Sequence, residues 1–72
     1  MITITEIGIV AGDIWQYLDK TGNATLDQIV RETKKPRELI LMSLGWLARE
    51  GHITLEGPDS GYRATLTQKK RI

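Results

Sequence analysis

The segment from Pro36 to Gly51, PRELILMSLGWLAREG, constrains the fold of this chain more than any other stretch. Proline is favoured at the first position of a helix and glycine just past its end, and only Gly45 interrupts the residues between them. The alternating stretch from His52 to Glu56 follows directly, as in a strand. The sequence therefore predicts one complete helix over 36–51 that leads straight into a strand.

A first helix is expected from Glu6 to Thr21. Thr3 or Thr5 is expected to cap it, and Thr3 with Glu6 has the spacing of a capping box. Gly22 and Asn23 favour the end of the helix. Its apolar residues recur at the three- and four-residue spacing of an amphipathic helix, namely Ile7, Val10, Ala11, Ile14, Trp15 and Leu18. Ahead of this helix, the alternation from Met1 to Thr5 predicts a short strand.

A second helix is expected to begin after Thr25, because Gln28 lies three residues further on and completes another capping box. Pro36 disfavours helical backbone at the residue before it, so this helix is expected to end near Thr33. The connection to the third helix is then about three residues long, which is the length of the turn in a helix-turn-helix. Ala24 and Thr25 are expected to form a short strand that pairs with a later hairpin.

The hairpin is predicted from two alternating stretches, His52 to Glu56 and Tyr62 to Thr67. Gly57 to Gly61, GPDSG, is a strong turn signal between them. The inward positions are expected to be Ile53, Leu55, Tyr62, Ala64 and Leu66. Residues 1–67 would then form one domain, followed by a basic, disordered tail over 68–72.

Three helices followed by a two-stranded hairpin define an α+β, mainly α fold, the winged helix-turn-helix. The stretches Gly8 to Trp15 (GIVAGDIW) and Leu44 to Ile53 (LGWLAREGHI) resemble a family of small, stand-alone prokaryotic winged helix-turn-helix proteins of largely unassigned function. The resemblance covers nearly the whole chain. It implies the fold and suggests that members self-associate, but it supplies no ligand and no site residues.

Catalysis and cofactor binding are not expected. The 72 residues include no cysteine and one histidine, His52, which is expected at the surface. Gly57 to Gly61 lacks the helix and lysine of a phosphate-binding loop. The longest uncharged run, Ile7 to Gly12, is far shorter than the roughly 20 residues that span a bilayer. We therefore expect a cytoplasmic protein that is not an enzyme and has no membrane, metal or small-molecule partner.

Double-stranded DNA is the first partner that the sequence suggests. The net charge is only +1, but basic residues cluster near residues 31–37 and again near 69–71. Such clusters either contact phosphates or are solvated surface. The candidate DNA-binding residues of a transcription regulator that contacts mainly phosphates are Lys34, Lys35, Arg37, Arg49, Arg63, Lys69, Lys70 and Arg71.

A homodimer or another protein interaction is the alternative. On a helical wheel of about 100° per residue, Ile40, Leu44 and Leu47 form the core stripe of the third helix. The opposite side offers few groups that read bases. Leu39, Met42 and Trp46 form a second apolar stripe beside the core stripe. One interpretation is that the first helix covers this stripe, with Trp46 near Gly12 or Trp15. Even then, Leu41 and Met42 are expected to stay exposed. A dimer would use the first helix, the segment from Ile2 to Ile4, or the flank of the third helix. The candidate interface residues on that flank are Leu39, Leu41, Met42 and Trp46.

Overall fold

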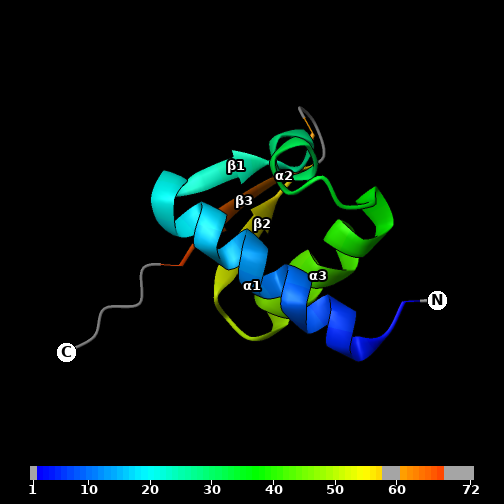
Figure 1. Ribbon diagram of the computed structural model, residues 1–72. Coiled ribbons are helices and arrows are strands. Elements are labelled where there is room, and N and C mark those ends of the chain that lie inside the picture. The colour runs from blue at the N-terminus through cyan, green and yellow to red at the C-terminus, as the bar shows by residue number, and fades with distance from the viewer. Residues whose placement is uncertain (1, 58–60, 68–72) are drawn as a thin grey trace.

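Three helices and a three-stranded antiparallel sheet make up the fold in the computed structural model, which describes residues 2–57 and 61–67 (Figure 1). The elements follow one another as α1 (Ile4–Thr21), β1 (Asn23–Thr25), α2 (Leu26–Thr33), α3 (Arg37–Arg49), β2 (Ile53–Glu56) and β3 (Arg63–Leu66). The expected winged helix-turn-helix architecture is therefore confirmed.

Two capping boxes fix the starts of α1 and α2, as predicted. The Thr3 hydroxyl accepts from the Glu6 N–H at 3.1 Å, and the Glu6 carboxylate accepts from the Thr3 N–H at 3.2 Å. Thr25 and Gln28 make the same reciprocal pair at 3.1 and 2.8 Å. The Thr3 cap starts α1 at Ile4, so the short strand predicted over residues 1–5 is wrong for residues 2–5.

The ends of α3 lie slightly inside the predicted range. Pro36 is the N-cap residue, with φ −59° and an extended ψ of 141°, and Arg37 is the first helical residue. The helix ends at Arg49, and the chain then turns at Gly51, whose φ is +80°. The Gly51 and His52 N–H groups donate to the carbonyls of Ala48 and Leu47, which closes the helix just before β2.

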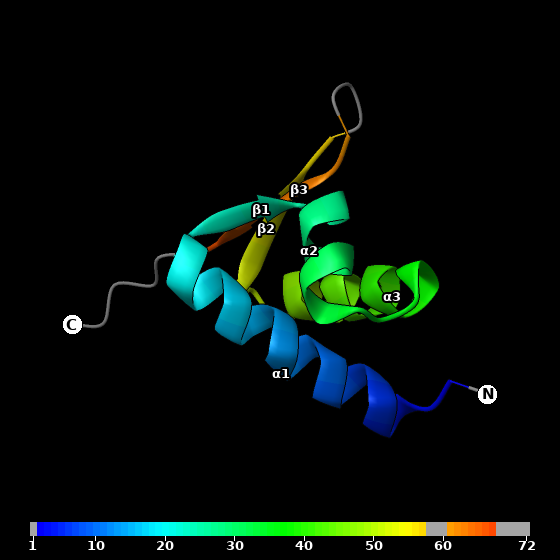
Figure 2. The same cartoon turned by 45° about the horizontal axis from the view of Figure 1, so that its top comes forward.

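The sheet has the order β1-β3-β2, so the short strand β1 adds a third strand to the hairpin. In register, Ala24 lies opposite Ala64, and Ala64 lies opposite Leu55 on the other side. Ala64 is buried, but Leu55 and Tyr62 are 43% and 49% exposed, so their predicted inward packing is wrong. The hairpin formed by β2 and β3 projects beyond the helices (Figure 2).

The core lies where α1 crosses α3 beside the sheet. Ile14, Leu18, Ile29 and Ile40 are completely buried there. Ser43, buried among them, places its hydroxyl 2.8 Å from the Leu39 carbonyl and 3.2 Å from the Ile7 carbonyl of α1. This contact fixes which side of α3 faces α1. Among the helices described, none combines the length and apolar character that a bilayer crossing requires.

Candidate protein and nucleic-acid interface

The outer side of α3 is exposed and partly apolar. Leu41, Met42 and Trp46 are 44%, 46% and 47% exposed, although large apolar side chains usually favour burial. Leu39 is different, because it is only 5% exposed and packs in the core. Leu39 is therefore a core residue of the single chain, while the other three candidates lie on the surface.

Trp46 is covered by α1 only in part. It lines an open groove of about 470 Å³ between α1 and α3. Trp15, Gly8 and Gly12 of α1 also line this groove. The groove is open above the two glycines, because a Cβ atom placed on either one would meet nothing within 4 Å. Trp46 therefore lies near Gly12 and Trp15, as one alternative held, yet nearly half of its surface is still exposed.

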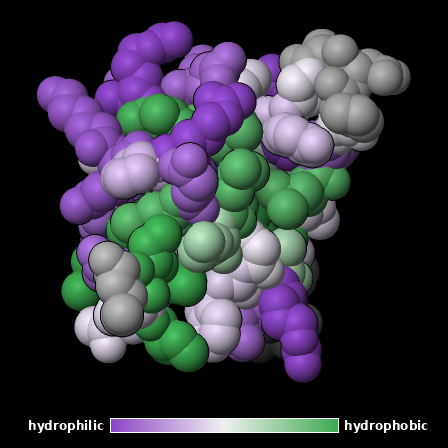
Figure 3. All heavy atoms as spheres, turned by 90° about the vertical axis from the view of Figure 1, so that its right-hand side faces the viewer, coloured by the Kyte–Doolittle hydropathy of each residue, from purple (hydrophilic) through white to green (hydrophobic). Residues whose placement is uncertain are grey.

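A second groove, of about 460 Å³, lies where the start of α1 meets the turn before α3. Ile2, Ile9 and Pro36 are among its apolar lining residues, and Glu6 and Lys35 supply its charges. Figure 3 shows hydrophobic side chains gathered in the middle of this side of the molecule. The groove makes the N-terminal end of α1 a further exposed apolar region.

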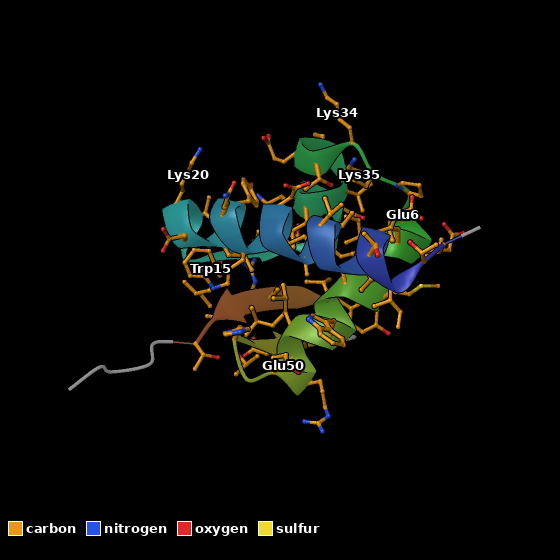
Figure 4. All side chains as sticks on the ribbon, turned by 60° about the horizontal axis from the view of Figure 1, so that its bottom comes forward. Glu6, Trp15, Lys20, Lys34, Lys35 and Glu50 are labelled. Carbon is orange, nitrogen blue, oxygen red and sulfur yellow. The ribbon has the colours of Figure 1, made fainter. Side chains whose placement is uncertain are left out.

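The two lysines of the turn between α2 and α3 differ in their surroundings. Lys34 adopts a left-handed conformation with φ 57° and is exposed, whereas Lys35 is half-buried at the second groove. In Figure 4, Lys34 projects away from the helices, whereas Lys35 stays close to them beside the turn. Lys34 is therefore the freer of the two to meet a phosphate.

Two of the predicted phosphate-binding arginines already contact groups within the domain. Arg37 forms an ion pair with Asp27 at 3.1 Å, with both side chains more than half exposed. Arg63 donates to the Asn23 side-chain oxygen and lies opposite Glu56 in the sheet. Arg49 is exposed at the end of α3. Lys69, Lys70 and Arg71 lie outside the described residues.

The sequence alone does not indicate the partners of Arg37 and Arg63, because both contacts depend on the tertiary structure. Asp27 precedes Arg37 by 10 residues and Asn23 precedes Arg63 by 40, so no helical spacing connects either pair. Nor does the sequence indicate the polar hollow of about 310 Å³ between α1 and α2, to which Asp13, Lys20 and Glu32 contribute. Within residues 2–57 and 61–67, no three His, Asp or Glu side chains converge to hold a metal ion.

The comparison with protein families agrees with this architecture. The sequence model of the winged helix-turn-helix domain family DUF2582 matches residues 2–66, which is nearly the whole chain. No curated protein shows a significant match. The protein therefore belongs to the DUF2582 family of winged helix-turn-helix domains.

Proposed function

We propose that this winged-helix domain is a protein-interaction module that forms a homodimer. The observation that carries the proposal is the exposure of Leu41, Met42 and Trp46 on the outer side of α3. In a DNA-binding winged helix, that side would offer hydrogen-bonding groups to base edges. Apolar groups there are better suited to burial against protein.

The size of the domain supports the same proposal. With 72 residues and no cysteine, the chain has a small core and no disulfide to stabilise it. Burial of an exposed apolar surface in a dimer would add stability that rises with the logarithm of protein concentration. A large aromatic side chain such as Trp46 is also typical of the residues that dominate binding energy in interfaces.

Sedimentation velocity over a wide concentration range tests this proposal. We expect dimers that dissociate on dilution, and we expect the double variant Leu41→Ser, Met42→Ser to remain monomeric where the unmodified chain is dimeric. Ile9→Ser on α1 is the matched control, because Ile9 is 59% exposed and lies outside α3. A folded chain that stays monomeric at every concentration would contradict the proposal.

Duplex DNA is the second candidate partner, and the position of Lys34 and Lys35 favours it. When a winged helix docks on DNA, the turn between α2 and α3 lies close to the sugar-phosphate backbone of the DNA. Binding would then be mainly to phosphates, with little sequence preference, as in a weak or partner-dependent transcription regulator.

Fluorescence anisotropy with labelled duplex DNA at two salt concentrations tests this candidate. A phosphate binder should lose affinity steeply with salt, and Lys34→Ala should lower the slope of log K against log salt by about one. Lys20→Ala on α1 is a matched control for the loss of one positive charge. Absence of binding at low salt would remove the DNA candidate.

A further inference from the structure

The exposed positions of α3 are arranged symmetrically along the helix. From residue 38 to residue 49, the exposed positions are Glu38, Leu41, Met42, Gly45, Trp46 and Arg49, and the positions between them are buried or half-buried. The midpoint of this set falls between Ser43 and Leu44. Each exposed residue therefore has a counterpart at the same distance on the other side of the midpoint.

The paired positions also match in angle around the helix. At about 100° per residue, Glu38 and Arg49 lie within about 20° of each other along the centre of the exposed side. Met42 and Gly45 flank this centre line at about 30°, and Leu41 and Trp46 lie at its two edges. A rise of about 1.5 Å per residue separates Glu38 from Arg49 by about 16 Å along the axis.

We infer that two copies of the chain pair through the outer sides of their α3 helices, in antiparallel orientation about a twofold axis near Ser43 and Leu44. This inference rests on the proposed homodimer and specifies its surface and orientation. A twofold interface uses the same patch on both copies, so the patch must be complementary to itself when reversed.

Charge and size both fit this reversal. Antiparallel pairing places Glu38 at the level of the partner's Arg49, and the reverse, so each end of the contact joins opposite charges. It also places Met42 at the level of the partner's Gly45, where a Cβ atom would meet nothing within 4 Å in the single chain. A parallel pair would instead bring Glu38 against the partner's Glu38, which is unfavourable.

The edges of the contact are apolar. The two Leu41 side chains meet along one edge and the two Trp46 side chains along the other. Trp46 continues into the groove it shares with Trp15, so the contact can extend from α3 onto α1. An interface limited to the exposed groups of one short helix would bury little surface area. Contacts that also include α1 would bring the buried area closer to that of a stable interface.

The pairing has a consequence for DNA. The outer side of α3 is the surface that would enter the major groove in a winged-helix complex. Antiparallel pairing covers that surface on both copies. Dimerisation and base contact by α3 therefore exclude each other.

Reversal of the charges tests the orientation. In sedimentation equilibrium, Glu38→Arg alone and Arg49→Glu alone should each weaken the dimer about tenfold or more, because each places like charges together at both ends of the contact. The double variant Glu38→Arg, Arg49→Glu should restore the dissociation constant to within about threefold of the original. The single effects should shrink as salt is raised.

Disulfide crosslinking tests the same pairing without changing the charges of α3, which could themselves alter the stability of the helix. The chain has no cysteine, so Gly45→Cys introduces a single thiol next to the proposed axis. Mild oxidation should convert it to a disulfide-linked dimer much faster than the control Asp19→Cys, whose residue is exposed on α1 and lies outside the groove shared by Trp15 and Trp46.

The outcomes separate the two proposals. Unchanged dissociation constants in both single variants, with no preferential crosslinking at Gly45→Cys, would overturn the α3 pairing. If the chain still dimerises in that case, the proposed homodimer stands and its surface lies elsewhere. A chain that is monomeric in every experiment removes both.

Discussion

The two sides of α3 carry apolar residues of similar size but differ in what surrounds them. On the inner side, Ile40 and Leu44 are almost completely removed from solvent. On the outer side, Leu41 and Met42 are nearly half exposed. The inner side therefore contributes to folding of the single chain, and the outer side can contribute free energy only when another molecule covers it.

The largest expected effect is on the inner side. Leu44→Ala should lower the free energy of unfolding by about 2–5 kcal/mol, because it removes buried methyl groups and leaves a cavity. Leu41→Ala, the matched outer change, should cost much less in dilute, monomeric protein. Urea denaturation of both variants measures the difference. Equal losses would show that the two sides of α3 do not differ as described.

The two glycines of this region should respond in opposite directions. Gly51 has φ +80°, so Gly51→Ala should cost about 1–2 kcal/mol of stability because a Cβ atom disfavours left-handed backbone. Gly45 lies within α3 and its Cβ position is open, so Gly45→Ala should stabilise the monomer by up to about 1 kcal/mol. Thermal unfolding at low concentration compares them. Destabilisation by Gly45→Ala would show that the outer side is not open.

A third effect is expected on association alone. Met42→Ala should weaken the dimer by about 1.4 kcal/mol, or tenfold in the dissociation constant, while the stability of the monomer changes little. Sedimentation equilibrium gives the first quantity and unfolding at low concentration gives the second. A large loss of monomer stability would mean that Met42 belongs to the core.

Local interactions were predictable from the sequence. The Thr3–Glu6 and Thr25–Gln28 capping boxes connect residues three apart, and both form as expected. The core stripe through Leu44 also follows from helical spacing and is buried. A short strand was also expected at Ala24 and Thr25, where the structure has β1.

Contacts between distant segments were not predictable in the same way. Leu39 lies at the edge of the core stripe on a helical wheel, and only the crossing of α1 over α3 decides that it is buried. That crossing is marked by the contact of Ser43 with the Ile7 carbonyl, 36 residues away. Similarly, Arg37 looked free in the sequence but pairs with Asp27 in the fold.

The central claim is that the outer side of α3 binds protein. Its most direct test is to record amide NMR spectra of ¹⁵N-labelled protein while the sample is diluted. We expect concentration-dependent shifts centred on Leu41, Met42, Gly45 and the Trp46 indole. At the concentrated end, the particle mass should be twice the 8.1 kDa of one chain. Spectra that do not change with dilution, or shifts confined to α1 or the hairpin, would contradict it.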